Sequence, residues 1–575
     1  MKKRKKVNSL HNIYFLIKIF NSPKFRIFCI LLLFLTIVHA LMPLINLELV
    51  KRLLNAIQVG DNLETIIIVF SIMVVMQITQ KVFVYLNNFA TELFQLKLNN
   101  HVSELIMTSI STMKYEKLFS PLTIDKLYFL RTTSTAKIGS IFSSFLSIFS
   151  SFVTFCSMFI YLFNWIPYHT ILVGISSIPI GVVQLYFNKK SFFLSQNINK
   201  HQREQFYLLH VATTPEYLKE IAQYSSMSYL VESHSNLFKN IFQPTKNLSK
   251  KQMIANILTS LLGVFAISYT QFKTVILAVQ GKILIGTLMS ILQALGNVFK
   301  GMQSLILSFG GFHSDWLYVN NLREFILSHE FDELEAPPQH IDMPISLSAK
   351  DLTYSVNGIT IFKNLNFHFT AGSVIGIIGE NGIGKTTLLE IIQGIKKEMS
   401  GELRFNNVLS TAISDVQRNN LSQTLHQNPS RYEFSLGENV GLSAIDKYKK
   451  SDNILRYIQQ IDQESFVFNM NLQENSRLGE WYDESQQLSG GQWQRIALYR
   501  LFFKRSPIYL IDEPTNNLDE NSLYLLEEMI KSVSKTSLVI MVSHDTSFLS
   551  EICTDIYSMT KNGLILQEQL EPQKV

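Results

Sequence analysis

Residues 379–387 read Gly379-Glu380-Asn381-Gly382-Ile383-Gly384-Lys385-Thr386-Thr387. Residues 379–386 fit the pattern G-x-x-x-x-G-K-[ST] of a loop that cradles phosphate groups. The apolar residues 373–378 before the loop predict a buried strand, and residues 387–392 after it predict the start of a helix. Glycines allow backbone N–H groups to close around phosphate oxygens, and the start of a helix adds partial positive charge. The stretch therefore predicts a nucleotide-binding α/β domain, in which Lys385 reaches the β and γ phosphates and the Thr386 hydroxyl binds Mg²⁺.

A second apolar segment, residues 506–511, leads into the acidic pair Asp512 and Glu513. An acidic side chain at the end of a buried strand can hold Mg²⁺ directly or through water, which we expect of Asp512. Glu513 beside it can polarise a water molecule aimed at the γ-phosphate. The alternative is an acidic pair on the surface, which agrees less well with the strand before it and with Pro514 and Thr515 after it.

The segment Leu488-Ser489-Gly490-Gly491-Gln492 precedes a helix that is predicted to begin near Trp493. Ser489 and the unhindered glycine amides at this helix start form a second candidate anion site. Two phosphate-binding surfaces far apart in one chain suggest that ATP is held between two copies, with the loop at 379–387 from one copy and Ser489 from the other. An ordinary glycine-rich turn stays open as the alternative.

Three more residues lie where contacts with a nucleotide are expected, although each is a weak signal by itself. Tyr354, ahead of the loop, could stack on adenine. Gln427 lies in His426-Gln427-Asn428-Pro429, at a predicted strand end. His544 follows the apolar strand at residues 538–541 and could contact the γ-phosphate.

The composition indicates a membrane protein. Of the 575 residues, 47% are hydrophobic and only 17% are charged. Soluble chains carry about 25% charged residues on average, so part of this chain is expected to face lipid. The net charge of +6 is small and unevenly placed, so nucleic acid is not an expected partner. The three cysteines, Cys29, Cys156 and Cys553, are far apart and predict neither a disulfide framework nor a metal cluster.

Six apolar stretches are long enough to span a bilayer: residues 27–49, 65–87, 138–163, 168–187, 253–277 and 284–309. Lys and Arg are concentrated before the first, between the second and third, and between the fourth and fifth stretches. These segments and both termini are therefore predicted to be cytoplasmic, with Lys51 and Arg52 as a local exception. The two long cytoplasmic segments keep an apolar spacing, which predicts helices that continue the spans. Each is expected to end in a short transverse helix that touches the soluble domain, near residues 115–131 and from 215 onward.

The predicted fold class has two parts: an all-α polytopic membrane domain, with six transmembrane helices extended into the cytoplasm, followed by an α/β P-loop nucleotide-binding domain. Residues 1–26 form a basic cytoplasmic N-terminus with an interfacial helix. A cleaved signal peptide is not expected there, because no small-residue cleavage site follows the apolar run. Residues 27–328 form the membrane domain, the proline-rich residues 329–344 a linker, and residues 345–575 the nucleotide-binding domain.

Six polar residues fall inside the predicted spans: Gln77, Gln80, Lys81, Asn256, Gln293 and Asn297. Polar side chains at such places usually face the interior of a helix bundle. They either line a cavity or hold neighbouring helices together, and the sequence leaves both readings open.

Taken in order, these motifs resemble those of ABC transporters, and the whole chain resembles an exporter-type half-transporter. The resemblance implies ATP hydrolysis coupled to transport, with ATP and Mg²⁺ as cofactors, and a second half-transporter as partner, most simply in a homodimer. It implies ATP binding by Tyr354, Gly379, Glu380, Asn381, Gly382, Ile383, Gly384, Lys385, Thr386 and Thr387. It implies metal binding by Thr386, Gln427 and Asp512, and catalysis by Glu513, His544 and Gln427. The signature motif that contacts the partner's ATP is Leu488, Ser489, Gly490, Gly491 and Gln492, and the D-loop is Asn517, Leu518 and Asp519.

Within that family the chain is most similar to bacterial peptide exporters of the lantibiotic type. Leu478-Gly479-Glu480-Trp481-Tyr482 and residues 487–498 carry this similarity, whereas many lipid and drug exporters have a Gly-Glu-Arg-Gly-like stretch where this chain has Asp483-Glu484. The implied function is export of a modified or leader-bearing peptide, such as a lantibiotic-type bacteriocin, across the bacterial cytoplasmic membrane by alternating access. Residues 1–26 hold no Cys/His pair, so leader cleavage by this chain is not expected.

Three other functions are weighed against peptide export. A lipid or multidrug exporter is the nearest alternative. A soluble ABC ATPase that acts on ribosomes or DNA is disfavoured by the six predicted spans. An ATP-gated channel or regulator that transports nothing is the third.

Overall fold

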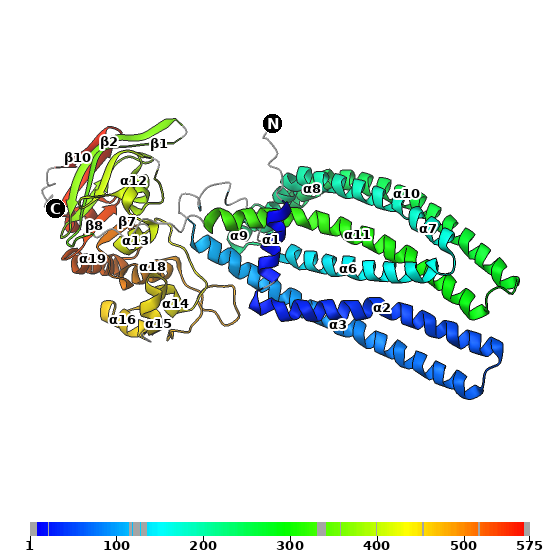
Figure 1. Ribbon diagram of the computed structural model, residues 1–575. Coiled ribbons are helices and arrows are strands. Elements are labelled where there is room, and N and C mark those ends of the chain that lie inside the picture. Colours follow the sequence, from blue (N-terminus) through cyan, green and yellow to red (C-terminus); the bar gives the residue numbers. More distant parts are fainter. Residues whose placement is uncertain are drawn as a thin grey trace. The chain divides into compact units, whose positions relative to one another are not determined.

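A computed structural model describes residues 9–20, 22–113, 118, 123, 127, 135–330, 341–356, 358–397, 399–450, 453–515 and 518–567. The chain divides into two compact units, Met1–Ser111 with Asp125–Glu330, and Thr112–Ile124 with Phe331–Val575. The first unit is helical and the second is an α/β domain (Figure 1), so the predicted fold class is confirmed. Residues 1–8 and most of the expected linker, residues 331–340, lie outside the described residues.

The helical unit is built from helices of very different lengths. They are α1 (Ser9–Phe20), α2 (Pro23–Val59), α3 (Leu63–Ser111), α6 (Thr135–Phe163), α7 (Pro167–Ser176), α8 (Ile178–Thr213), α9 (Pro215–Gln223), α10 (Met227–Val279) and α11 (Ile285–Glu330). At 1.5 Å per residue, the 49 residues of α3 extend over roughly 70 Å, about twice the thickness of a hydrocarbon core. Helices of this length continue well past a membrane span, as the apolar spacing predicts.

Five described helical segments are long and apolar enough to cross a membrane: Phe25–Val59, Leu63–Ser111, Lys137–Phe163, Pro167–Ser195 and Met227–Val279. The sixth predicted span falls in α11, which is a continuous helix but is not among those five. Its buried residues Ile291, Ala294 and Val298 pack with residues of α2 and α6 in one hydrophobic cluster, and Figure 1 shows α11 running along α6. A helix enclosed by its neighbours needs less apolar surface than one that faces lipid.

The fourth predicted span is not one uninterrupted helix. The helix breaks at Ser177, between α7 and α8. Pro179 lies in the first turn of α8 and lacks the N–H that would continue the hydrogen-bond ladder. The Ser177 hydroxyl, which is buried, donates to the carbonyl oxygen of Gly174 at 2.6 Å. The fourth predicted span, residues 168–187, thus falls on α7 and α8, within the segment Pro167–Ser195 that is long and apolar enough to cross a membrane.

A short helix, α9, separates α8 from α10 and coincides with one of the two expected transverse helices. The other candidate, residues 115–131, lies mostly outside the described residues. Contact of either one with the α/β unit stays a prediction.

The α/β unit contains two sheets. Its strands are β1 (Ser346–Val356), β2 (Ile359–Thr370), β3 (Val374–Ile378), β4 (Met399–Phe405), β5 (Val408–Leu409), β6 (Ser422–Leu425), β7 (Ile508–Asp512), β8 (Leu538–Val542), β9 (Asp555–Thr560) and β10 (Gly563–Gln567). One sheet has the order β2-β1-β4-β5 with antiparallel pairs. The other has the order β10-β9-β3-β8-β7-β6, in which β9, β3, β8, β7 and β6 are parallel. Strands β7 and β8 are buried along their whole length, which explains their continuous apolar sequence.

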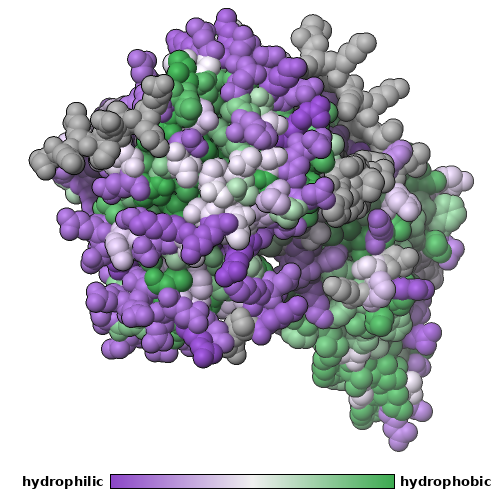
Figure 2. Space-filling model, turned by 90° about the vertical axis from the view of Figure 1, so that its left-hand side faces the viewer, coloured by the Kyte–Doolittle hydropathy of each residue, from purple (hydrophilic) through white to green (hydrophobic). Residues whose placement is uncertain are grey.

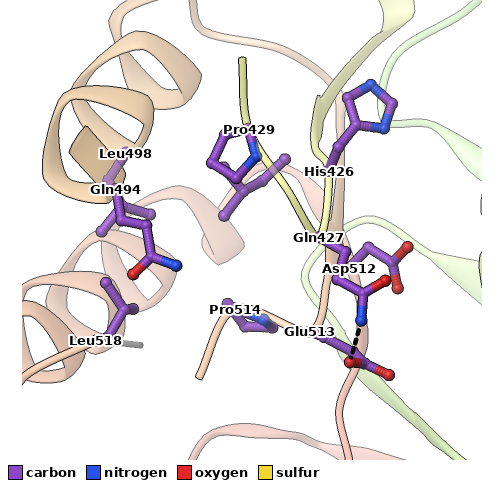
Figure 3. Close-up of a pocket in the computed structure, with 10 residues that line it drawn as sticks. His426, Gln427, Pro429, Gln494, Leu498, Asp512, Glu513, Pro514 and Leu518 are labelled. Atoms are coloured by element: carbon purple, nitrogen blue, oxygen red, sulfur yellow. Dashed lines mark hydrogen bonds between the residues drawn. The ribbon is translucent and has the colours of Figure 1, made fainter. Parts of the chain in front are cut away.

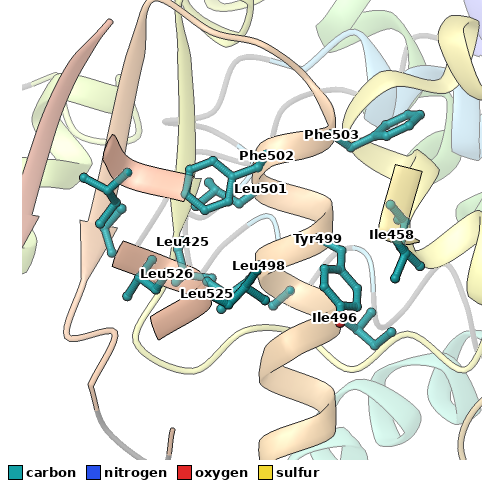
Figure 4. Packing of buried hydrophobic residues seen from close by; sticks show 14 of the residues in the cluster. Leu425, Ile458, Ile496, Leu498, Tyr499, Leu501, Phe502, Phe503, Leu525 and Leu526 are labelled. Carbon is teal, nitrogen blue, oxygen red and sulfur yellow. The ribbon is translucent and has the colours of Figure 1, made fainter. Parts of the chain in front are cut away.

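The α/β unit also contains helices. They are α12 (Lys385–Gln393), α13 (Asp415–Leu421), α14 (Leu436–Gly441), α15 (Ile445–Lys450), α16 (Ile454–Ile461), α17 (Phe466–Asn469), α18 (Gly490–Phe503), α19 (Glu520–Ser534) and α20 (Thr546–Ile552), with 3₁₀ turns at Ser410–Ala412 and Leu442–Ala444. Helix α18 is the centre of one core cluster, in which Ile496 and Leu498 pack with Leu526 of α19 (Figure 4). The buried Tyr499 hydroxyl donates to Asp462 Oδ2 at 2.5 Å and shares a 2.7 Å hydrogen bond with Ser465.

The surfaces of the two units differ in polarity. The α/β unit shows mainly hydrophilic side chains, whereas much of the helical unit that is visible in Figure 2 is hydrophobic. Along α3 and α10, large apolar side chains such as Phe70, Val75 and Phe265 are more than half exposed. Exposed apolar surface on this scale marks contact with lipid or with another protein.

The hydrogen bonds of Tyr499 give a stability prediction. We expect Tyr499→Phe to cost about 1–2 kcal/mol of unfolding free energy, because the buried Asp462 carboxylate loses its short hydroxyl donor. Thermal unfolding of the purified full chain should show a lower midpoint for this variant. Tyr524→Phe is the matched control, since Tyr524 on α19 is 66% exposed. Equal midpoints for the two variants would contradict the role of the Tyr499 hydroxyl.

Candidate nucleotide-binding site

The parallel sheet brings four separate segments of the chain to one edge. Strands β3, β8, β7 and β6 are neighbours, and their carboxyl ends meet because they run in the same direction. The segments that follow them hold the loop at 379–387, His544, the Asp512–Glu513 pair and Gln427. In open α/β sheets, ligands bind in the crevice outside such carboxyl ends.

The glycine-rich loop connects β3 to α12 in the predicted strand–loop–helix arrangement. Gly382 and Gly384 have φ angles of 78° and 110°, in the left-handed region that favours glycine. A Cβ atom at Gly384 would also lie only 2.7 Å from the side chain of Ile361. The loop therefore needs glycine at position 384 both for its backbone conformation and for its close approach to β2.

The Lys385 ammonium lies across this loop. Its Nζ donates to the carbonyl oxygens of Gly379 at 2.7 Å and Glu380 at 3.1 Å. Burial lowers the pKa of Lys385, while the nearby Glu513 and Asp512 carboxylates act in the opposite direction. The Lys385 ammonium has lost much of its hydration, and the two carboxylates compensate for only part of that loss. Such an ammonium is well suited to attract phosphate oxygens.

Glu513 connects three of the expected catalytic side chains. Its Oε2 accepts a hydrogen bond from Gln427 Nε2 at 2.7 Å (Figure 3), and its Oε1 lies 3.1 Å from His544 Nε2. The same His544 nitrogen is 3.4 Å from Lys385 Nζ. Glu513, Gln427, His544 and Lys385 therefore bring four different segments of the chain together.

The backbone of Glu513 is strained. Its φ angle of 46° is unfavourable for a residue with a side chain, at a typical cost of about 1–3 kcal/mol. Its N–H donates to the carbonyl oxygen of Val542 at 2.8 Å, which holds it at the end of β7 against β8. Such strain often occurs where a side chain must be aimed at a reacting group.

Asp512 is a buried acid with unused capacity for a ligand. It is 3% exposed, and burial raises its pKa, while a hydrogen bond from the Thr386 hydroxyl partly opposes this shift. Its Oδ1 is buried and has no hydrogen-bond partner among the described residues. Among these residues, no group of three or more His, Cys, Asp or Glu side chains could hold a metal. One carboxylate beside one hydroxyl suits Mg²⁺, which keeps waters and binds substrate phosphates.

The expected signature residues form a well-defined helix start. Ser489 caps α18: its hydroxyl accepts from the N–H of Gln492 at 3.3 Å, and its own N–H donates to Gln492 Oε1 at 2.8 Å. Ser489 and Gly490 are exposed, and a Cβ atom added at Gly490 would meet no neighbour in the structure. Leu488 is half-buried against the core around α18. None of the described hydrogen bonds of Ser489 and Gln492 reaches the loop at 379–387 of the same chain.

The remaining predicted residues are placed as follows. Tyr354 is only 7% exposed, with the ring of Phe362 6.2 Å away and Lys396 Nζ 5.7 Å from its centroid. Stacking of Tyr354 on adenine stays a prediction. Asp519 caps α19 by accepting from the N–H of Ser522, Leu518 lines a small pocket beside Glu513, and Asn517 lies outside the described residues.

Part of this pocket is not predicted from the sequence. His426 and Pro429 line it next to Gln427, and Gln494 and Leu498 of α18 close its other side (Figure 3). The sequence neighbourhood of Gln427 could have pointed to His426 and Pro429. The contribution of α18 depends on long-range packing and has no local signal.

Comparison with known proteins agrees with this geometry. Residues 362–516 match the family described as ABC transporter. The nisin transport ATP-binding protein NisT of Lactococcus lactis subsp. lactis is 26% identical over 527 residues, which cover 90% of this chain and 86% of that protein. The subtilin transport ATP-binding protein SpaT of Bacillus subtilis is 26% identical over 521 residues, covering 88% and 83%. The ATP-binding protein Uup of Escherichia coli (strain K12) is 33% identical but matches only 38% of this chain.

The fold has also been seen in a solved structure. A bacterial Atm1-family ABC exporter with ATP bound superposes with a TM-score of 0.73 over 93% of each chain, at 15% sequence identity. At this identity the similarity concerns the fold alone, and it includes the helical unit as well as the α/β unit. Residues 362–516 therefore carry an ABC transporter ATPase domain, and the similarity over most of the chain supports an exporter-type half-transporter that couples ATP hydrolysis to transport.

Proposed function

We propose that the protein exports a modified or leader-bearing peptide, such as a lantibiotic-type bacteriocin, across the bacterial cytoplasmic membrane. The observation that carries this proposal is the similarity to the nisin and subtilin transport proteins over 90% and 88% of the chain. The similarity includes the helical unit, through which cargo would pass. Relatives such as Uup match only 38% of this chain, which is about the length of the ATPase domain. The distribution of Lys and Arg supports a location of both termini in the cytoplasm.

In the proposed ATPase cycle, the glycine-rich loop and Lys385 bind the phosphates, and Glu513 polarises the attacking water. Gln427 and His544 hold the two carboxylate oxygens of Glu513 in place, which aims the carboxylate before nucleotide arrives. His544 also lies next to Lys385, which is proposed to bind the phosphates. The imidazole of His544 would therefore couple the position of the γ-phosphate to that of Glu513.

Asp512 and Thr386 are the residues proposed to hold Mg²⁺, with Gln427 close by. The partnerless Oδ1 of Asp512 and the adjacent Thr386 hydroxyl fit a small cation that takes most of its ligands from water and phosphate. When bound, Mg²⁺ supplies charge neutralisation for the phosphate groups.

The second half-transporter is proposed to be another copy of this chain. The N terminus of α18, with exposed Ser489 and Gly490, can donate backbone N–H groups to an anion. This anion is proposed to be the phosphate of an ATP that the other copy holds in its glycine-rich loop. Each copy would complete the ATP site of the other, giving two competent sites in a homodimer. Binding of ATP to the closed pair would then shift the membrane helices from inward-facing to outward-facing.

The export proposal is tested by reconstituting the full chain in proteoliposomes and measuring ATP hydrolysis with candidate cargo. A leader-bearing lantibiotic precursor should stimulate the ATPase in a saturable way, while drugs and lipids should not. Stimulation by drugs or lipids alone would instead support a lipid or multidrug exporter.

Glu513→Gln tests the catalytic role. The amide keeps the shape of the side chain but cannot polarise water, so we expect turnover to fall by at least about 100-fold, as for the loss of a general base. ATP binding, measured with a fluorescent ATP analogue, should persist. Glu528→Gln on α19 is the control, since the ion pair described for Glu528 is an exposed one with Lys531. Normal steady-state hydrolysis by Glu513→Gln would refute the assignment.

Asp512→Asn tests the metal site through stability. Because burial raises the pKa of Asp512, its ionised form destabilises the folded state at neutral pH, and a neutral amide should raise the unfolding midpoint without nucleotide. The added stabilisation that Mg²⁺ brings in the presence of ATP should disappear in this variant. An unchanged effect of Mg²⁺ on the midpoint would mean that Asp512 does not hold the ion.

Lys385→Ala tests the loop. Loss of the ammonium removes the main positive charge at the phosphates, so ATP affinity should fall about tenfold or more, as for a lost charge-assisted hydrogen bond. A filter-binding assay with labelled ATP measures this directly. The assignment fails if the variant binds ATP as tightly as the wild type.

A further inference from the structure

Helix α10 carries a stripe of uncharged polar side chains on one face. Its members are spaced three, four and four residues apart, so they lie above one another along the helix: Ser249, Gln252, Asn256 and Ser260. Together with Gln303 of α11 they line a groove of about 760 Å³, counting its open mouth. Asn256 and Ser260 fall inside the predicted fifth span, and Ser249 and Gln252 come just before it.

The groove contains no charged lining residue in the described part of the chain. Carboxamides and hydroxyls each offer both a donor and an acceptor. Such a surface matches neutral amide groups better than the phosphate of a lipid headgroup or a cationic drug, which favour a charged partner. The chemistry of the groove is therefore that of a peptide main chain.

Holding helices together explains only part of this stripe. Gln252 of α10 does reach Gln184 of α8 at 3.5 Å, the limit of a hydrogen bond, whereas the 3.0 Å bond from Gln184 to Asn188 lies within α8. Asn256, however, has a buried Oδ1 without a hydrogen-bond partner among the described residues. A buried amide oxygen without a partner is costly, which indicates that a ligand or water satisfies it when the transporter works.

The spacing of the stripe also suits an extended chain. Side chains four residues apart on a helix are separated by about 6 Å along its axis. Main-chain groups on one edge of an extended strand repeat every two residues, at about 6.7 Å. From Ser249 to Ser260 the stripe covers about 16 Å, which corresponds to about five residues of extended peptide.

We propose that this stripe binds the main chain of an extended segment of the cargo peptide. Asn256 is the central contact, and Met253 and Ile257, which are 54% and 51% exposed beside it, contact cargo side chains. The inference rests on the proposed function and gives it a physical basis for accepting peptides of different sequence. Recognition of backbone amides depends little on which side chains the cargo carries.

The test uses the full chain in lipid nanodiscs and two fluorescent hexapeptides of alanine and leucine with blocked ends. They differ only in that one is N-methylated at alternate backbone nitrogens, which removes N–H donors and keeps the side chains. Binding is measured by fluorescence anisotropy. We expect the wild type to bind the N-methylated peptide about five- to tenfold more weakly, as for one or two lost hydrogen bonds.

Asn256→Leu should weaken binding of the unmodified peptide by a similar factor and bind both peptides about equally. Asn247→Leu is the matched control, because Asn247 is exposed and lies nine residues earlier, on the opposite face of α10. It should keep the wild-type preference. Ser260→Ala, a milder change in the same stripe, should reduce that preference and guards against misfolding of the leucine variant.

The outcomes separate this inference from the proposed function. If the wild type binds both peptides equally, or if Asn256→Leu and Ser260→Ala keep the full preference, the stripe does not read the main chain, and peptide export itself still stands. If neither peptide binds and a lantibiotic precursor also fails to stimulate the ATPase, both the inference and the proposed function are overturned.

Discussion

The parallel alignment of β3, β8, β7 and β6 is the constraint on which the nucleotide site depends. It places Lys385, His544, Glu513 and Gln427 at one edge of the sheet, although more than a hundred residues separate the first from the third. Strands β3, β7 and β8 are almost entirely buried, so their ends are fixed by hydrophobic packing instead of by the polar groups themselves. The site can therefore tolerate a strained backbone and a carboxylate oxygen without a hydrogen bond. Glu513 has a left-handed backbone, and the Oδ1 of Asp512 has no hydrogen-bond partner among the described residues.

The helical unit follows a different physical rule. Its longest helices exceed the thickness of a bilayer and present large apolar side chains outward, so lipid or a second subunit takes the place that a hydrophobic core takes elsewhere. Polar side chains inside such a unit are expensive unless they are satisfied. The uncharged polar stripe of α10, and Asn256 in particular, is proposed to gain its hydrogen-bond partners from the bound cargo.

Much of this architecture could be predicted because its signals are local. Runs of neighbouring residues are enough to identify the glycine-rich loop, the apolar strand before Asp512 and the long helices. The break at Ser177 was missed because the apolar run continues through Pro179, which ends one helix and begins another. The central position of α11 lowers its need for apolar residues, so its composition alone is a weak guide. The contacts that α18 brings to the pocket, and the approach of Gln252 to Gln184, join residues far apart in sequence and depend on the completed fold.

Nucleotide hydrolysis at the strand ends is proposed to move a peptide through the helical unit. The most direct measurement is uptake of a labelled lantibiotic precursor into inside-out proteoliposomes that contain only this protein. The account predicts accumulation that depends on ATP and Mg²⁺ and stops when ATP is replaced by ADP. Equal accumulation with ATP and with ADP would contradict it.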